Sequence, residues 1–412
     1  MPPAIASAYE LELEWIPLIK AFLALSLGNF AIALGAYLIV GLLVPLARDL
    51  KVGDAESGLM MVIYAGAYAV SSPVLVNLSS MWPRRATLLA SLACFAGGIC
   101  LTALAGEWTL ALVGRAVSAM GAGLYTPTAA STVYTLSPPK RRGRNLSIVF
   151  FGILFAQAVG MPAGMLLEAR FGWKAALLSV VAVVVAASMA IIATLPSRVG
   201  PPRPPASPWL LVGNRTALLG LALTIAHLLA YSAVYTFIGP ITVSYGQVDA
   251  FGVLLTMGVA GAFGSIAVGL LADRVTPRTL LLVVMSVEAL ALPLFSWSGA
   301  PAALVLGIAG LWAMASAAFM VPQQVRLVRQ APDHQSLVLA LNATATYAGF
   351  ALGSGIGSIV AGVIGLQGLG VTGGLLALIG LALLLRLPES QQAPFVDCAR
   401  VRSKACSDPY AG

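Results

Sequence analysis

Polar side chains set within long apolar stretches are the groups of this sequence that could do chemistry. An ionisable side chain costs at least about 2.5 kcal/mol in the middle of a membrane, so such groups face a bundle interior or a water-filled cavity. We therefore predict that these groups contact a solute or carry a proton; for Arg115, a snorkelled or purely structural side chain near the outer end of its span is the alternative. They are Asn29, Arg115, Gln157, His227, Tyr231, Tyr235, Glu288 and Asn342.

His227 and Glu288 are the pair with acid–base potential. Each lies about a dozen residues from the same end of its apolar stretch, which at about 1.5 Å per residue places both at a similar depth. Burial and a neighbouring charge control whether a carboxyl group holds its proton, and imidazole titrates near neutral pH. We predict a proton-linked element here. The alternative is that Glu288 is a neutral acid hydrogen-bonded to a neighbouring segment.

Three ring side chains follow one another at helical spacing. His227, Tyr231 and Tyr235 are four residues apart in turn, which places them on one face of a helix. We expect this face to contact the solute. Because the interior holds few charges, a neutral or singly charged molecule such as a sugar, a nucleoside or a lipophilic drug fits it best.

Composition identifies the setting of these groups. Charged residues make up 9% of the 412 residues and apolar residues 59%, and the mean hydropathy is +0.93. A soluble domain keeps roughly a quarter of its residues charged. The sequence predicts an all-α membrane protein with twelve transmembrane helices, which we place at 17–44, 55–79, 84–106, 107–136, 144–167, 172–195, 214–245, 250–272, 277–299, 301–328, 335–364 and 367–387.

Basic residues fall in every second connection between these spans. All but five of the 23 lysines and arginines lie on one side, and the five are Arg48, Lys51, Arg115, Arg170 and Lys174. By the positive-inside rule both termini are cytoplasmic in a multi-pass protein of the inner (plasma) membrane. The formal charge of +8 is spread over short loops. It therefore reflects membrane topology and does not indicate a nucleic-acid partner.

The spans divide into two sets of six. A proline-rich segment, 196–213, is predicted to be an extended cytoplasmic linker between bundles at 1–195 and 214–387, and 388–412 to be a cytoplasmic tail. The halves resemble each other at offsets of about 193 to 195, which pair Gly160 with Gly353 and Pro127 with Pro322. Two six-helix repeats of this kind place a solute site between them near mid-membrane, opened alternately to each side.

Two loops and two spans carry recognisable patterns. The loop from Gly269 to Arg278 contains Asp273 and Arg274, and its counterpart carries Arg84 and Arg85. Span 4 contains Arg115 followed by Ala119 and Gly121, and span 5 contains Gly152, Gly160, Pro162 and Gly164. With these patterns the chain resembles the major facilitator superfamily, and within it the twelve-span drug/proton antiporter group of arabinose-efflux-like permeases. The resemblance covers about residues 17–390.

The resemblance implies roles for these patterns. The loop residues would form a conformational latch between the halves, with Asp273 facing the start of span 5; a solvated turn is the alternative. Ser80 and Met81 stand where the group has Asp and Arg in the first-half loop, so that latch is weakened. The span 5 glycines and proline resemble an antiporter motif and favour export, although small residues also serve ordinary helix packing. Ala36 replaces a glutamate of the group, so the chain would couple through other residues or not at all.

Other functional classes lack their motifs. The sequence has no His-Glu-x-x-His, no Gly-x-Ser-x-Gly and no phosphate-binding glycine loop with lysine, so we expect neither an enzyme nor an ATP-driven pump. We expect no disulfide, no metal and no cofactor. The prediction is a monomeric exporter of a small solute that uses a proton gradient. A facilitator or uptake symporter is the alternative, and a non-transporting receptor a more distant one.

Overall fold

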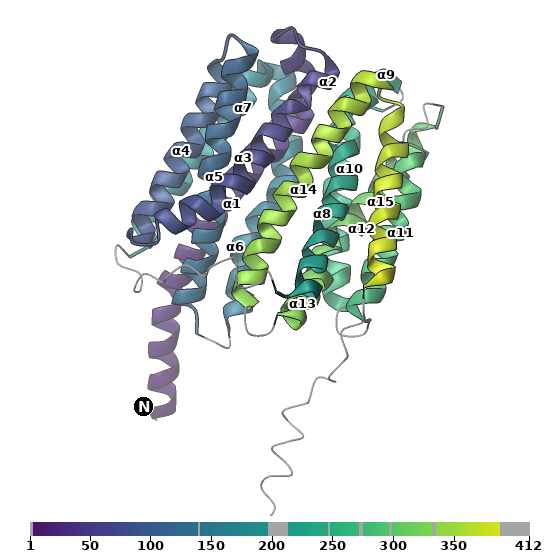
Figure 1. The fold of residues 1–412 in the computed structure, drawn as a ribbon. Coiled ribbons are helices and arrows are strands. Elements are labelled where there is room, and N and C mark those ends of the chain that lie inside the picture. The colour runs from purple at the N-terminus through teal and green to yellow at the C-terminus, as the bar shows by residue number, and fades with distance from the viewer. Residues whose placement is uncertain are drawn as a thin grey trace, which may run out of the picture.

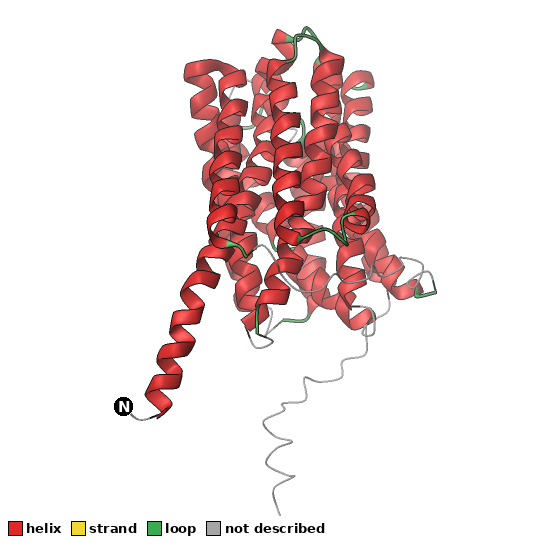
Figure 2. Ribbon diagram, turned by 90° about the vertical axis from the view of Figure 1, so that its left-hand side faces the viewer, coloured by secondary structure: helices red, strands yellow, loops and turns green. Residues whose placement is uncertain are grey.

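The protein is a bundle of long helices in a computed structural model that describes residues 3–138, 141–196, 213–245, 248–271, 275–295, 299–331 and 335–387. Within these residues the regular structure is helical, and strands are absent (Figure 2). The first half holds α1 (Pro3–Asp49), α2 (Asp54–Ser57), α3 (Leu59–Leu78), α4 (Arg84–Leu104), α5 (Trp108–Leu136), α6 (Arg142–Phe155), the π-helical η2 (Ala156–Gly160) and α7 (Met161–Thr194). The second holds α8 (Arg215–Tyr235), α9 (Ile238–Tyr245), α10 (Ala250–Leu271), α11 (Pro277–Phe295), α12 (Ala302–Ala317), α13 (Met320–Gln330), α14 (Gln335–Val363) and α15 (Gly368–Arg386).

Twelve passes of the chain can be traced through the bundle. In the described part, ten helical segments are long and apolar enough to cross a membrane. One of them, Arg144–Thr194, has 51 residues, against the roughly 20 that one crossing needs. It divides at Gly172, whose φ of 81° is a backbone conformation that glycine adopts most easily. Helix α5, with 29 residues, completes the twelve. The predicted fold class is thereby confirmed, although α1 begins earlier than the predicted span and projects from the bundle (Figures 1 and 2).

The bundle has two ends, which we name by their connections. The terminal face carries the start of α6, the start of α8 and the end of α15, and the distal face carries the α1–α2 connection and the end of α9 (Figure 1). The first and second halves of the chain form neighbouring groups of helices in this view. Helix α3 packs against α14, α1 against α9, and α10 against η2.

Contacts between the halves lie at the distal face and in the middle. Gly58, at the start of α3, packs against the ring of Phe237. A Cβ on Gly258 would lie 2.8 Å from the carbonyl oxygen of Gln157, so α10 and η2 touch along their backbones. In the middle, the rings of Tyr68 and Tyr347 stack with centroids 3.4 Å apart. The two halves are thus joined from mid-bundle to the distal face.

Three of the predicted latch arginines donate hydrogen bonds to groups of their own half at the terminal face. Arg84 donates to Ser131 Oγ at 2.9 Å, Arg85 to the carbonyl of Leu195 at 3.3 Å, and Arg278 to the carbonyl of Leu385 at 3.2 Å. The other two predicted latch residues, Asp273 and Arg274, lie outside the described residues. The latch therefore stays a prediction.

Three spans are interrupted four residues before a proline. Proline has no N–H, and its ring displaces the carbonyl four residues earlier, so it breaks or distorts a helix there. Pro162 follows the π-helical segment η2, Pro240 follows the break between α8 and α9, and Pro322 follows the break between α12 and α13. Before Pro162 the distortion takes the form of a π-helical segment, which frequently marks functional sites.

Candidate functional site

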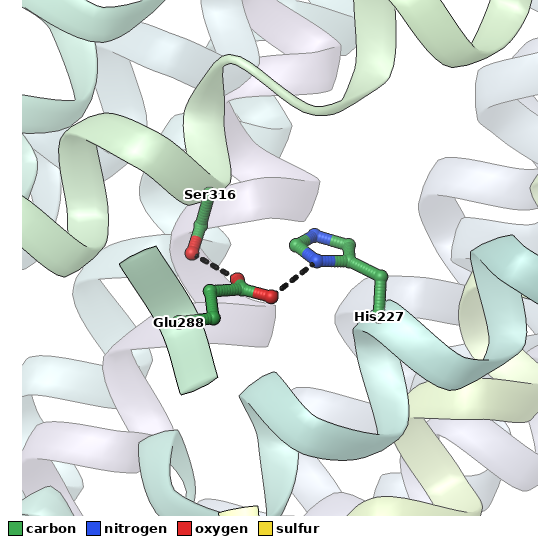
Figure 3. A network of polar contacts seen from close by, with 3 residues as sticks. All are labelled: His227, Glu288 and Ser316. Atoms are coloured by element: carbon green, nitrogen blue, oxygen red, sulfur yellow. Dashed lines mark hydrogen bonds and ion pairs between the residues drawn. The ribbon is translucent and has the colours of Figure 1, made fainter. Parts of the chain in front are cut away.

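The most distinctive polar group in the bundle joins three helices of the second half (Figure 3). His227 of α8 and Glu288 of α11 meet through Nδ1 and Oε2 at 2.9 Å. Ser316, in the last turn of α12, donates to Oε1 of the same carboxyl group at 2.6 Å. His227 is 3% exposed and Glu288 is fully buried. The structure therefore brings the two predicted proton-linked residues together.

The geometry restricts where a proton can lie. Because Oε1 of Glu288 accepts from Ser316, a proton shared with His227 lies on the line between Oε2 and Nδ1. The imidazole ring stacks on Phe319 with centroids 3.8 Å apart and planes 12° apart. An acid and an imidazole joined in this way can share one proton. Binding a second proton leaves both the imidazole and the carboxyl group protonated.

Aromatic rings continue from this pair towards the first half. Tyr231 lies with its ring centroid 6.4 Å from that of His227, and Tyr235 stacks on Tyr231 at 4.8 Å. Tyr37 of α1 then meets Tyr235 edge-on at 6.3 Å. The three residues predicted to share a face do share it. The row formed by His227, Tyr231, Tyr235 and Tyr37 crosses from one half to the other, and we call it the aromatic row.

Gln157 lies where the aromatic row reaches the first half. It belongs to η2 and is partly exposed. Its side chain lies close to the hydroxyl group of Tyr37, and its backbone packs against Gly258 of α10. Gln157 is therefore at the boundary between the halves, as expected for a residue that contacts the solute.

Two predicted solute-binding residues brace helices of a single half. Asn29 is fully buried, donates to the carbonyl of Val149 at 3.1 Å and accepts from Thr126 at 3.0 Å. Asn342 is 2% exposed and accepts from Thr224 at 2.7 Å. Since a buried amide lowers the free energy of the fold by making such bonds, bracing accounts for their polarity.

Arg115 is enclosed near the distal end of its helix, seven residues into α5. Its side chain is fully buried and donates to the carbonyl of Gly35 at 3.0 Å and to that of Met60 at 3.5 Å. Its guanidinium carbon lies 4.2 Å from the ring centroid of Tyr64. Carbonyl oxygens and a tyrosine face thus hold the charge, which ties α5 to α1 and α3.

The glycines of span 5 allow close packing against α1. Gly152 meets the backbone of Ser26, and Gly160 and Gly164 meet the side chains of Phe30 and Leu38. At each of these three glycines, a larger side chain would occupy the space that α1 fills. The motif therefore serves helix packing in this structure, whatever its further role.

Some residues around the site were not predicted from the sequence. Ser316 gave no signal, because a serine in an apolar helix commonly bonds to its own backbone. Tyr37, Trp312 and Tyr347 sit among many apolar residues, and only their position in the assembled bundle distinguishes them.

Metal-ligand clusters of three or more His, Cys, Asp or Glu side chains are absent from the part of the chain that the structure describes.

Comparison with known proteins places this arrangement in a family. A sequence profile described as "Major Facilitator Superfamily" matches residues 25–268 and 220–397. The chain belongs to the major facilitator superfamily. The predicted family is thereby confirmed, and with it a small-molecule transporter of the multi-pass membrane type.

Relatives within the superfamily are transporters by name. The chain is 27% identical to "Inner membrane transport protein YdhP" of Escherichia coli (strain K12), over 91% of this chain and 97% of that protein. It is 25% identical to a "Probable sugar efflux transporter" of Haemophilus influenzae (strain PittGG), over 83% and 87%. The solved structure of a "D-xylose-proton symporter" superposes with a TM-score of 0.75 at 15% identity, over 91% and 99%, and shows the shared fold.

Proposed function

We propose that this superfamily member exports a small organic solute across the cytoplasmic membrane in exchange for protons. The solute is neutral or singly charged, and the terminal face is the cytoplasmic one. The observation that carries the proposal is the buried contact between His227 and Glu288, which supplies a proton site beside the aromatic row.

A buried acid–imidazole pair is energetically costly, and this cost calls for a functional explanation. Removing two ionisable groups from water costs several kcal/mol, and well-packed apolar side chains often stabilise a fold as well or better. Ionisable groups inside a membrane bundle therefore mark ion and proton pathways more often than structural contacts. An imidazole and a carboxyl group can each bind and release a proton, which is the chemistry that coupling to a proton gradient requires.

The arrangement of the halves supports alternating access. Contacts between the halves run from mid-bundle to the distal face, and at the terminal face Arg85 and Arg278 each donate to a carbonyl of their own half. Such a state is the one expected when the central site communicates with the cytoplasm. The breaks before Pro162, Pro240 and Pro322 lie in three spans and provide places where helices can bend.

Export and the kind of solute rest on likeness and on composition. One similar protein is named a sugar efflux transporter, and the span 5 glycines resemble an antiporter motif. The aromatic row offers ring faces and hydroxyl groups, and the two interior charges, on Arg115 and Glu288, already have partners. A sugar, a nucleoside or a lipophilic drug satisfies these conditions, and a multiply charged solute does not.

Proteoliposomes test the proposal directly. Purified protein is reconstituted with a pH-sensitive dye inside, and a panel of sugars, nucleosides and lipophilic dyes is added under an imposed pH gradient. We expect solute-dependent proton flux in the wild type, and loss of that flux in Glu288→Gln and His227→Ala. The matched control is Glu107→Gln, an exposed acid at the distal face. Proton-driven flux that both site variants leave unchanged would refute the assignment.

A facilitator is the second candidate, because Ala36 stands where similar permeases have a glutamate. It predicts that solute equilibrates across the liposome membrane without a gradient and without proton movement. The same panel separates the two functions, since only the exporter accumulates solute against its own gradient.

A further inference from the structure

The break in span 10 lies directly beside the acid–imidazole pair. Helix α12 ends at Ala317 and α13 begins at Met320, so Ala318 and Phe319 form the break. Pro322 explains its position, since it cannot donate to the carbonyl of residue 318. Ser316, which contacts Glu288, directly precedes this break, and Phe319, which contacts His227, lies in it.

Both contacts are close and buried. Ser316 Oγ lies 2.6 Å from Glu288 Oε1, and the fully buried Phe319 ring lies 3.8 Å from the His227 ring. Each member of the pair is therefore attached to span 10 through a different residue. The next turn is anchored elsewhere, because Gln323 donates to the carbonyl of Gly220 at 2.6 Å and to Thr224 at 2.9 Å.

We propose that Ser316 and Phe319 are positioning residues that tie the number of protons held by the His227–Glu288 pair to the bend of span 10. The inference rests on the proposed function, since it explains how a proton would move a helix. It assigns to Ser316 and Phe319 the connection between the chemistry and the conformation.

The physical reason lies in what each contact prefers. A serine hydroxyl donates more strongly to a carboxylate than to a neutral acid, because hydrogen bonds to charged groups are about twice as strong. A ring face attracts an imidazolium more than a neutral imidazole. Protonating the carboxyl group of Glu288 therefore weakens the hold of Ser316, and protonating the imidazole of His227 strengthens the hold of Phe319. When both groups are protonated, the two contacts have changed in opposite directions, one just before the break and one within it.

Movement of α12 would reach the boundary between the halves. Helix α12 packs along α10, where the backbone of Gly264 touches that of Met314. Helix α10 in turn meets η2 of the first half through Gly258 and Gln157. Helix α13 is instead fixed to α8 by Gln323. A change of bend therefore shifts α12 and α10 relative to α8.

Other titratable groups near the pair are few. Tyr231 of α8 lies near Glu288, with Tyr235 one turn further along and Tyr37 beyond it on α1. The described helices α10 and α12 carry no titratable side chain. The packed ends of α11, α13 and α15 carry arginines only, at the terminal face: Arg278, Arg326, Arg329 and Arg386. Within the described helices α8 and α10 to α15, His227 and Glu288 are therefore the imidazole and carboxyl groups that a titration follows.

Infrared titration tests the role of Ser316. The carbonyl band of a protonated carboxylic acid is followed against pH in purified protein in lipid, and the part that Glu288→Gln removes belongs to Glu288. Ser316→Ala removes a donor to the carboxylate, so we expect the midpoint of this band to move to higher pH by about one unit. Ser316→Thr keeps the hydroxyl and is expected to retain the wild-type midpoint.

The matched control is Ser179→Ala, whose hydroxyl bonds only to the carbonyl of Ala176 in its own helix. A midpoint for Ser316→Ala equal to that of this control would overturn the role of Ser316. A shift in Ser316→Thr as large as in Ser316→Ala would do the same, since it would show a packing effect.

Spin-label distances test the bend. Labels at Leu311 and Val325, which are 47% and 37% exposed, lie on α12 and α13 on either side of the break. We expect their distance to change across the titration in the wild type and to stay fixed in Glu288→Gln. Phe319→Leu is expected to lose the change, and Phe95→Leu, another fully buried phenylalanine, to keep it. An unchanged wild-type distance, or a normal response in Phe319→Leu, would overturn the inference.

Neither measurement uses a solute or a gradient. A protein that shows both shifts yet moves no protons in liposomes overturns the proposed function alone. A protein that couples transport to protons yet shows neither shift overturns this inference alone.

Discussion

Replacing Glu288 by alanine and by glutamine separates its hydrogen bonds from its charge. Alanine leaves His227 Nδ1 and Ser316 Oγ without their partner. Each unsatisfied buried group costs about 1–3 kcal/mol, and breaking a buried ion pair costs about 3–5 kcal/mol. We expect Glu288→Ala to lose about 3–5 kcal/mol of unfolding free energy. Glutamine offers an oxygen to Ser316 and an N–H to neutral His227, so we expect Glu288→Gln to lose about 1 kcal/mol or less.

Reversible unfolding in mixed detergent, followed by circular dichroism, measures both variants. A double-mutant cycle with His227→Ala isolates the contact, and contacting residues commonly show coupling of about 0.5–3 kcal/mol. Two results would refute the reasoning: equal stability of the alanine and glutamine variants, or additive effects of Glu288→Ala and His227→Ala. Either would mean that the two side chains are not joined in the folded protein.

Three further predictions concern the rest of the bundle. Asn342→Leu is expected to lose about 1–3 kcal/mol of stability by leaving Thr224 unpaired, with an unchanged KM for solute; a raised KM at normal stability would instead make it a solute contact. Gly258→Val would press on the backbone of Gln157, and we expect it to open the distal face. The opening would be measured as faster labelling, by an impermeant reagent, of a cysteine that replaces Tyr37 in a cysteine-free background. The control Gly269→Val has open space around it and should be labelled at the wild-type rate. Gly172→Ala places a side chain at a φ of 81° and is expected to cost about 1–3 kcal/mol in the same unfolding assay.

The spans were predictable because hydropathy and charge determine them together. Span 5 was expected to end at 167 and span 6 to begin at 172, and the helix divides at Gly172 although it is otherwise continuous. A side chain that must not face lipid gives a clear signal in sequence. The depth of His227 and Glu288 followed from counting residues along their helices, because the rise per residue is constant.

The roles of interior polar residues were less predictable. Asn29 and Asn342 were predicted to contact solute, which stays a prediction, and in the structure both brace helices. The sequence shows that an amide avoids lipid, but lining a cavity and bracing a helix need the same polarity. Ser316 was missed for a related reason. Its bond to Glu288 depends on the rotation of α12 about its own axis, which the packing of three helices determines.

The two repeats are unequal at the positions that matter for coupling. At an offset of 194, which lies within the range found in the sequence, His227, Glu288 and Ser316 correspond to Ala33, Cys94 and Ala122. These counterparts offer no acid and no imidazole, and the thiol of Cys94 bonds to the carbonyl of Val117 on a neighbouring helix. A second proton site related by the repeat is therefore absent from the described first half. Ala36, at the position where the resembling permeases carry a glutamate, likewise offers no proton site in span 1. The proposed coupling would then pass from the second half to the first through the contacts of α10 with η2 and of Tyr235 with Tyr37.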